Sequence, residues 1–428
     1  MKFLKPNWLP QLNPQVWILI AGRFLSQIGT GFTLFYAPIF FVNQVGLSAT
    51  QVGFALGSAS ISGVIGRILS GSMSDSRFWG RKRTLLISAA VSAIASLVLA
   101  ATTNFSTLVV GNLLMGLGIG LYWPATEAVV ADLTNGEQRR EAYALTRLGD
   151  NLGLGLGSVI GGLLIGTTGA YRALFVIDAI SFVVFLGVVY AAIAETYRPV
   201  AHNAQQSGRL NGWAIALRDR TLLVYVVVNI IFTTYISQLQ STMPLYFKNF
   251  IPVGGSEYGF STTTISAIFA WHIALEIVLQ LPIARALSRF AHPQALTISA
   301  LFWAVGFVLI WVTGVIPSSQ LAWAIVGMGV LAIATVVYTP VASSLVADIA
   351  PESLRGLYLS INSLCWAAGY AIGPPLGGWA LDQPPVVAHG FWLGLFLSVV
   401  PTIAILQYLN RILPRKNSGV RSQNSEEG

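Results

Sequence analysis

Residues 124–132 read Pro-Ala-Thr-Glu-Ala-Val-Val-Ala-Asp, and residues 340–348 read Pro-Val-Ala-Ser-Ser-Leu-Val-Ala-Asp. Both copies lie inside long apolar runs, and their alignment continues without a gap. It pairs Arg139 with Arg355, Gly153 with Gly369, Gly157 with Gly373, and Gly161 with Gly377. This repeat predicts a fold made of two similar halves that run in the same direction.

The composition indicates that each half is a membrane bundle. Of the 428 residues, 54% are hydrophobic and only 9% are charged, whereas about 25% of a soluble domain is charged. A bilayer core needs about twenty apolar residues per helix, and a closed β-barrel would show alternating segments of about ten. The runs here do not alternate, so we predict an all-α membrane protein with six transmembrane helices per half. The expected helices are 15–42, 50–73, 84–103, 106–131, 141–166, 171–194, 221–248, 261–283, 294–314, 320–346, 356–381 and 389–411.

The basic residues predict the orientation of these helices. With the N-terminus in the cytoplasm, only Arg172 and Lys248 of the 24 lysines and arginines fall on the outer side. Another three, Arg23, Arg67 and Arg147, fall within helices, and the rest lie in cytoplasmic segments. This bias follows the positive-inside rule. It predicts a multi-pass protein of the cell inner membrane with both termini in the cytoplasm.

The same distribution argues against several other classes of protein. The net charge of +8 follows the topology, whereas a nucleic-acid-binding protein would gather its basic residues on one soluble face. The single cysteine and four scattered histidines show no metal-ligand spacing. No phosphate-binding loop or catalytic constellation is visible. We therefore expect no enzyme activity, no cofactor, no metal site and no nucleic-acid partner.

The predicted domains follow from the repeat. We expect an N-terminal six-helix bundle over 1–194, a cytoplasmic linker over 195–220 and a C-terminal six-helix bundle over 221–413. Part of the linker, 209–220, is amphipathic enough for a short helix on the membrane surface. The polar tail 414–428 has the composition of a disordered segment.

One loop carries a resemblance to a known family. Between the second and third predicted helices, the chain reads Gly71-Ser-Met-Ser-Asp75-Ser-Arg77-Phe-Trp-Gly80-Arg81-Lys82-Arg83. This stretch resembles the loop signature of the major facilitator superfamily, with two extra residues between Asp75 and Gly80. The resemblance implies that the loop latches the cytoplasmic gate. The residues that would do so are Gly71, Asp75, Gly80, Arg81 and Lys82.

Two further stretches resemble the twelve-helix drug/proton antiporter branch of that superfamily. Gly116, Gly118 and Pro124 fit its fourth-helix pattern, although Asn112 stands where the branch usually has an arginine implicated in proton coupling. Its fifth-helix glycine signature matches Gly153 and Gly157, and helix eleven repeats it. Glycines spaced by four lie on one helix face and allow close packing. Static packing and an antiport role are both open for Gly153, Gly157, Gly369 and Gly373.

Ionisable residues within the predicted spans are candidates for proton coupling or gating, because charge in hydrocarbon is costly. In the first half we expect Arg23, Arg67 or Arg147 to pair with Glu127 and Asp150. In the second half, His272 and Glu276 stand four residues apart on one helix face, and a His–Glu pair can exchange a proton near neutral pH. Buried structural ion pairs are the alternative for each. The candidates are Arg23, Glu127, Arg147, Asp150, Asp178, His272 and Glu276, with Arg67 as a further possible partner.

Prolines and aromatic residues suggest where a substrate path would run. The first, fourth, seventh and tenth predicted helices contain Pro38, Pro124, Pro244 and Pro340, and proline permits a kink. In the superfamily these helices line the cavity. A pocket for lipophilic molecules needs aromatic walls with few polar anchors. The candidate lining residues are Tyr36, Tyr122, Trp123, Tyr235, Gln238, Tyr338 and Trp366.

The functional expectation is secondary active transport by alternating access, with the two halves rocking around a midplane site. The resemblance implies proton-coupled efflux of small lipophilic compounds, with the lipid bilayer, protons and a small-molecule substrate as partners of a monomer. A symporter or facilitator for a polar nutrient or metabolite is one alternative. A non-transporting membrane scaffold or sensor is another.

Overall fold

The computed structural model describes residues 12–197, 209–252, 259–287, 289–351 and 354–413. The tail 414–428 and part of the expected linker lie outside the described residues. All fourteen regular elements in these ranges are α-helices. They are α1 (Pro14–Leu34), α2 (Ala37–Asn43), α3 (Ala49–Ser74), α4 (Gly80–Ala100), α5 (Phe105–Leu133), α6 (Gly136–Thr168), α7 (Tyr171–Ala192), α8 (Arg209–Ala216), α9 (Arg220–Asn249), α10 (Thr262–Leu287), α11 (His292–Val315), α12 (Gln320–Ile349), α13 (Arg355–Leu381) and α14 (Pro385–Ile412).

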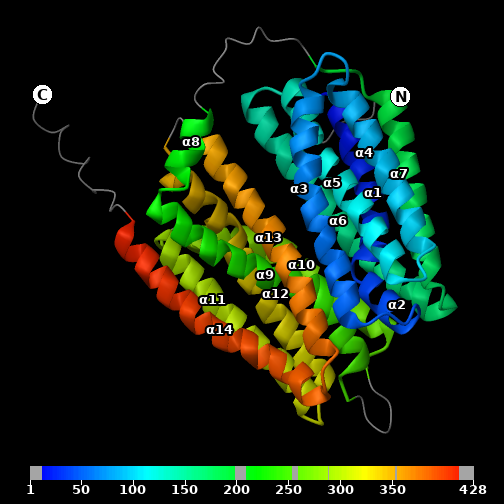
Figure 1. Ribbon diagram of the computed structural model, residues 1–428, viewed down its shortest axis with the longest axis vertical. Helices are drawn as coiled ribbons and strands as arrows, with labels where there is room; N and C mark the ends of the chain where they lie inside the picture. Colours follow the sequence, from blue (N-terminus) through cyan, green and yellow to red (C-terminus); the bar gives the residue numbers. More distant parts are fainter. Residues whose placement is uncertain (1–11, 198–208, 253–258, 288, 352–353, 414–428) are drawn as a thin grey trace, which may run out of the picture.

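The helices form two bundles that stand side by side (Figure 1). In the first bundle, α5 packs on α3 and α4, and α1 packs on α6 and α7. In the second bundle, α11 packs on α12 and α14, while α9 packs on α13. The main contacts between the bundles pair α3 with α13 and α6 with α10. The predicted pair of helical bundles is therefore confirmed.

The lengths of the helices match a bilayer. Eleven spans of the described chain are long and apolar enough to cross a membrane, with α1 and α2 forming one span, Pro14–Asn43. The twelfth long helix, α13, is not among them, although it has 27 residues. It packs between α3 and α9, and its sequence is rich in glycine and polar residues. A helix held between two protein neighbours needs less apolar surface than one facing lipid.

Proline and glycine explain where the helices begin and end. The predicted helix 15–42 is split at Phe35 and Tyr36, because Pro38 has no N–H to donate to the preceding turn. Pro124, Pro244 and Pro340 instead lie inside continuous helices. The third predicted helix begins four residues earlier than expected, at Gly80.

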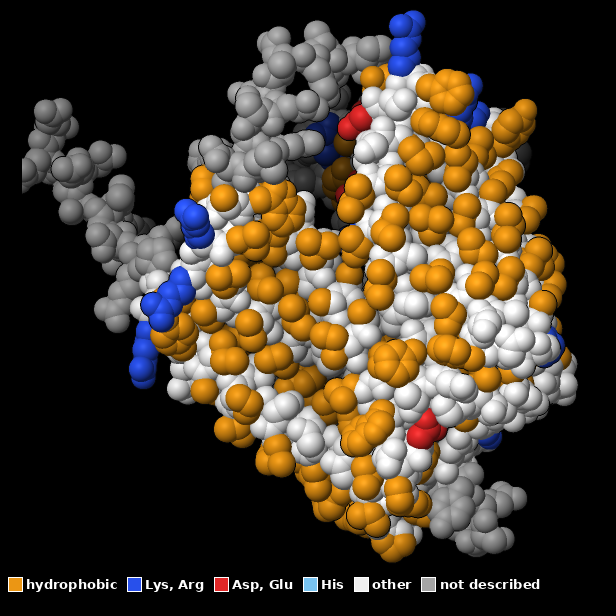
Figure 2. All heavy atoms as spheres, in the orientation of Figure 1, with side chains coloured by type: hydrophobic (Ala, Val, Ile, Leu, Met, Phe, Trp, Pro, Cys, Tyr) orange, Lys and Arg blue, Asp and Glu red, His pale blue; other side chains and the backbone are white. Residues whose placement is uncertain are grey.

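The bundles converge at one face and separate at the other. We call the face where α7 ends and α8 begins the linker face, and the opposite one the far face. In Figure 1 the bundles approach each other toward the far face, and in Figure 2 the surface is hollowed between them toward the linker face. Apolar side chains cover much of the surface seen in Figure 2, as expected for a protein surrounded by lipid.

Candidate functional site

Backbone-to-backbone packing closes the far face. A Cβ on Gly57 of α3 would stand 2.8 Å from the carbonyl oxygen of Ala371 on α13, and a Cβ on Gly53 would overlap that of Pro374. These glycines let the two helices touch without side chains between them. The contact joins the first bundle to the second, so the far face can open only if α3 and α13 separate.

Polar contacts reinforce this closure. The side-chain amides of Asn43 and Asn249 form reciprocal hydrogen bonds of 2.8 and 2.9 Å between the bundles. The hydroxyl of Tyr36 donates to the carbonyl of Ser158 at 2.7 Å and also contacts the hydroxyl of Ser266 on α10. Tyr36, expected in the cavity wall, is 1% exposed and bridges α6 and α10 instead.

Arg23 and Asp150 form a buried ion pair inside the first bundle. Their side chains are 3% and 6% exposed. One guanidinium nitrogen donates to the carboxylate at 2.7 Å, and Nε lies against the second carboxylate oxygen. The guanidinium carbon also stands 4.3 Å from the ring centre of Tyr122 and 4.2 Å from that of Trp123. Two aromatic rings and a carboxylate therefore hold this arginine in place.

More charged groups extend from this pair. The guanidinium of Arg147 lies 4.7 Å from the ring centre of Trp123, so this ring stands against two cations. Arg67 interacts electrostatically with Glu127 and Arg147, and it donates a hydrogen bond to the hydroxyl of Ser363 in the second bundle. Both Glu127 and Arg147 are exposed. Apart from Asp178, the predicted charged residues of the first half thus form one cluster, which reaches across to α13.

His272 and Glu276 form the corresponding polar group in the second bundle. Nε2 of His272 lies 3.2 Å from a carboxylate oxygen of Glu276, and Nδ1 lies 2.9 Å from the carbonyl oxygen of Met328 on α12. The histidine side chain is 6% exposed and the glutamate 30%. The pair therefore links a buried imidazole to an accessible carboxylate.

Asp178 is buried away from this cluster. It lies on α7 with 1% exposure, and one carboxylate oxygen contacts the hydroxyl of Ser96 on α4 at 2.7 Å. The other oxygen has no hydrogen-bond partner among the described residues. A Cβ on Gly29 would crowd this oxygen at 2.8 Å, so α1 closes directly over the carboxylate.

The predicted gate loop is a tight turn that leads into α4, and Arg81 and Lys82 lie in the first turn of this helix. Arg81 contacts Asp75 at 2.7 Å and Asp132 of α5 at 3.0 Å. Gly80 has a φ of +69°, which favours glycine. A Cβ on Gly71 would meet nothing within 4 Å, so no neighbouring helix packs closely against this glycine.

Glu195 and Asp132 complete this loop and were not identified from the sequence. The carboxylate of Glu195 accepts hydrogen bonds from the backbone amides of Arg81 at 2.9 Å and Lys82 at 3.1 Å. A carboxylate at these free amides caps the N-terminus of α4. Asp132 ends the repeated stretch that begins at Pro124, but the sequence does not show which basic residue it meets.

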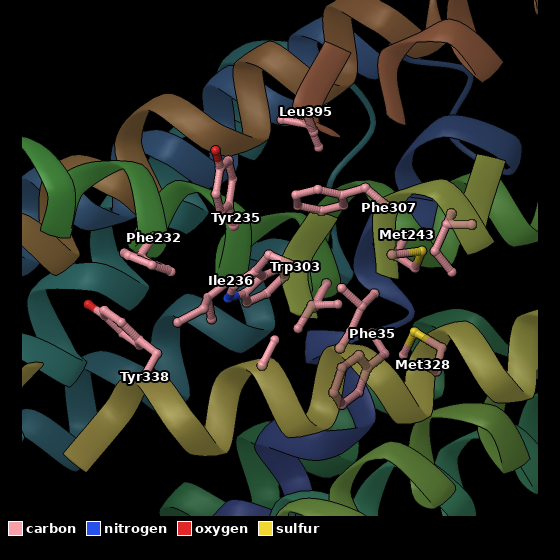
Figure 3. Close-up of a cluster of buried hydrophobic side chains, with 14 of the residues drawn as sticks. Phe35, Phe232, Tyr235, Ile236, Met243, Trp303, Phe307, Met328, Tyr338 and Leu395 are labelled. Carbon is pink, nitrogen blue, oxygen red and sulfur yellow. The ribbon is translucent and has the colours of Figure 1, made fainter. Parts of the chain in front are cut away.

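Several expected lining residues point elsewhere. Tyr235 packs inside the second bundle, with ring centres 5.7 Å from Trp303 and 5.1 Å from Phe307 (Figure 3). Its hydroxyl contacts Ser398 of α14 at 2.6 Å. Gln238 is fully buried and donates to the carbonyl of Gly373 at 2.9 Å. Both side chains therefore face their own bundle, and Tyr235 also lines a pocket between α9, α13 and α14 together with Trp379. A role of either residue in the substrate path stays a prediction.

Tyr338 belongs to a buried polar network that the sequence analysis missed. Its hydroxyl donates to Asn229, whose amide donates to Asn362 at 2.8 Å. Tyr225 donates to the same oxygen of Asn362 at 2.5 Å. These contacts join α9, α12 and α13. Trp366 lies at the edge of this group, with its ring centre 6.2 Å from that of Tyr338.

The signature glycines pack within each bundle. A Cβ on Gly153 would stand 2.7 Å from the carbonyl oxygen of Phe24, and one on Gly157 would overlap that of Ile28, both on α1. On α13, Gly369 and Gly373 stand against the hydroxyls of Thr233 and Ser237 of α9. Each glycine pair therefore seats one long helix against its neighbour in the same bundle.

Among the described residues, no group of three or more histidine, cysteine, aspartate or glutamate side chains could hold a metal ion. The buried ionisable groups instead include two ion pairs, Arg23–Asp150 and His272–Glu276, flanked by aromatic rings or by a backbone carbonyl. Such pairs can hold or move a proton, or hold two helices together.

Comparison with known proteins identifies the family. The family described as "Major Facilitator Superfamily" matches residues 19–253 and 249–427. A "Na(+), Li(+), K(+)/H(+) antiporter" of Planococcus maritimus is 25% identical over 396 residues, covering 86% of this chain and 90% of the relative. "Multidrug resistance protein MdtH" of Yersinia enterocolitica is 26% identical over 369 residues, covering 86% of each chain.

Solved structures share the fold at lower identity. The nucleoside transporter NupG superimposes with a TM-score of 0.78 at 15% identity, covering 94% of this chain and 100% of that one. A peptide transporter POT mutant gives 0.74 at 16% identity, covering 92% and 95%. These similarities confirm the predicted fold of two six-helix bundles.

Proposed function

Since the chain belongs to the Major Facilitator Superfamily and is therefore a multi-pass membrane transporter rather than an enzyme, we propose that it exports small lipophilic compounds in exchange for protons. The proposal includes alternating access around a site between the bundles. Arg23, Asp150, Trp123 and the His272–Glu276 pair are its central residues.

The observation that carries this proposal is the asymmetric contact between the bundles. At the far face, α3 and α13 touch through glycines and proline carbonyls, while Figure 2 shows a hollow toward the linker face. One sealed face and one open face are what alternating access requires of a single conformation. Ionisable groups that are costly in hydrocarbon lie in both bundles.

The side chains around Trp123 favour a lipophilic cargo. Around Trp123, Arg23 is paired with a buried carboxylate and both Arg23 and Arg147 stand against the ring, so aromatic surface lies beside the one exposed cation. Ligand pockets for apolar molecules combine such surface with few polar groups. Relatives named as multidrug resistance proteins support the same direction.

Two alternatives differ in their cargo. Exchange of monovalent metal cations for protons is supported by the name of the Planococcus relative. A symporter or facilitator for a polar metabolite remains the other candidate. The nucleoside and peptide transporters are less than 20% identical to this chain, so their similarity concerns the fold alone and favours no cargo.

The orientation, the location and the oligomeric state are part of the proposal. We place both termini and the gate loop in the cytoplasm of a cell with an inner membrane, because the basic residues gather on that side. The hollow then opens to the cytoplasm, where a compound to be exported would enter. We propose a monomer, with a complete path between its own two bundles.

The test is transport in proteoliposomes that contain the purified full-length chain and an imposed proton gradient. We expect a lipophilic fluorescent dye to be transported in the direction opposite to the flow of protons. An uncoupler that dissipates the proton gradient should abolish this transport. Empty liposomes and the Arg23→Ala variant are the controls. Dye transport that continues unchanged after the uncoupler is added would contradict proton coupling. Transport of sodium or potassium ions, with no transport of dye, would favour cation exchange.

A further inference from the structure

The imidazole of His272 stands between two hydrogen-bond acceptors. On one side, Nδ1 is 2.9 Å from the carbonyl oxygen of Met328. On the other side, Nε2 is 3.2 Å from a carboxylate oxygen of Glu276. A carbonyl oxygen can only accept, so Nδ1 must carry a hydrogen to make the first contact.

The second contact then requires one more proton. A neutral imidazole with hydrogen on Nδ1 has a bare lone pair on Nε2, and an ionised carboxylate also only accepts. Two acceptors at this distance repel each other unless a proton lies between them. The proton is on Nε2 in an imidazolium–carboxylate pair, or on Glu276 in a neutral pair. In both cases the pair holds one proton more than a neutral histidine beside an ionised glutamate.

The surroundings allow this proton to be exchanged. The histidine is buried, while 30% of the glutamate side chain is exposed, so the carboxylate is the end of the pair that a proton from outside the bundle can reach. Among the described residues Glu276 forms no other ion pair, and the hydroxyl of Tyr370 on α13 lies within electrostatic reach of it. A Cβ on Gly155 of α6 would stand 3.3 Å from Ile273, so the pair lies on a helix that touches the other bundle.

We propose that His272 and Glu276 together form the binding site for the exchanged proton, and that this conformation is the proton-loaded form. The proposal rests on the proposed function and names the residues that couple it. Movement of α10 relative to α12 would separate Nδ1 from the carbonyl of Met328 and remove one of the two acceptors. The proton would then leave to water through Glu276. A buried structural pair is the competing interpretation, and it predicts no exchange.

The first experiment counts the proton without measuring transport. Nuclear magnetic resonance of the reconstituted full-length protein, labelled at histidine nitrogens and glutamate carboxyl carbons, reports both protonation states. The measurement is made about one pH unit above 6.5, the usual pKa of histidine, where a free imidazole is neutral. We expect either a doubly protonated His272 or a protonated Glu276. His272→Asn and Glu276→Gln assign the signals. A neutral His272 beside an ionised Glu276 would overturn the proposal.

The second experiment separates coupling from folding. Glu276→Gln should retain exchange of substrate for substrate across the membrane, which needs no net proton movement, but should lose accumulation driven by a proton gradient. Glu276→Asp should restore part of the driven accumulation. His292→Gln is the matched control, because His292 also lies near a carboxylate, that of Asp348 at 3.8 Å, but at the linker end of α11. Equal losses of exchange and driven accumulation in Glu276→Gln would show a structural role.

The two proposals can fail separately. A wild-type transport rate that does not depend on the proton gradient would overturn proton-coupled efflux, whatever the resonance spectra show. Intact gradient-driven transport in Glu276→Gln would leave efflux standing and remove this pair as the proton site. If Glu276→Gln does not fold, the number of protons measured on His272 and Glu276 of the wild-type protein still shows whether this pair holds the extra proton.

Discussion

Asp382, at the end of α13, caps the first turn of α3 in the opposite bundle through Thr50. Its carboxylate accepts 2.8 Å hydrogen bonds from the backbone amides of Ala49 and Thr50 and a 2.5 Å bond from the hydroxyl of Thr50. These amides have no partner within their own helix. A negative charge at a helix N-terminus is also favoured by the helix dipole. The far face is therefore held closed by a cap that one bundle supplies to the other.

Asp382→Asn should weaken this closure. The amide keeps its size but loses the charge, and a hydrogen bond to a charged group contributes about 1.5–3 kcal/mol. We expect a larger share of molecules open at the far face. Disulfide formation between cysteines placed at Asn43 and Asn249, with Cys365 replaced, measures closure and should slow in the variant. Thr50→Val, which leaves both amide bonds in place, should show a smaller effect. Equal cross-linking in all three proteins would contradict the role of the cap.

Gly157→Ala should destabilise the first bundle. Its Cβ would overlap the carbonyl oxygen of Ile28 on α1, and overpacking costs about 1–3 kcal/mol. Gly394→Ala on α14 is the matched control, because a Cβ there meets nothing within 4 Å and the change should be neutral or slightly stabilising. Thermal unfolding in detergent compares them. The same melting temperature for both variants would rule out tight α1–α6 packing.

Asp150→Asn should be among the most damaging single changes in the first bundle. It would leave the guanidinium of Arg23 buried without its charge partner, and breaking a buried pair costs about 3–5 kcal/mol. Arg23→Lys should also be harmful, because lysine cannot make the paired contacts or stack between the rings of Tyr122 and Trp123. Thermal stability and dye efflux measure the effects. If the double variant Arg23→Met, Asp150→Leu folds and transports normally, the pair is structural only.

Asp178→Asn should leave the stability unchanged or raise it. The carboxyl group is 1% exposed and one of its oxygens lacks a partner, so a charge there would be poorly compensated. A neutral amide of the same shape can still accept from the hydroxyl of Ser96. Asp178→Ala, which removes that contact and leaves a void, should lower the melting temperature. A marked loss of stability in Asp178→Asn alone would show that the ionised carboxylate has a partner.

Hydropathy, basic-residue bias and the internal repeat were sufficient to predict the architecture. Each is a local or additive property of the chain. Hydrophobic length identifies a span, and the match between residues 124–132 and 340–348 shows the duplication. The break at Tyr36 was not predicted, because Pro38 accounts for it physically but Pro124, Pro244 and Pro340 lie inside continuous helices. The exception is α13, which has the length of a span but not its hydropathy.

The site was predicted less completely. Charged residues could be identified as candidates because charge is rare in hydrocarbon, and pairs four residues apart, such as His272 and Glu276, can be seen in the sequence. The residue facing each pair could not. Met328 presents a backbone carbonyl, which has no sequence signal. Glu195 lies more than a hundred residues from the amides it caps. Tyr235 is an aromatic residue of the type expected in a cavity wall, but its side chain faces its own bundle.

The sequence by itself determined that this protein spans a membrane as two copies of one six-helix plan with a few buried charges. Only the tertiary structure decided which of those charges meet, which glycines seat which helices, and which face is closed. The physical reason is that burial depends on one segment at a time, whereas a hydrogen bond or an ion pair needs two groups within about 3 Å. Folding brings such groups together from helices far apart in the chain, as it does for Asp382 and Thr50.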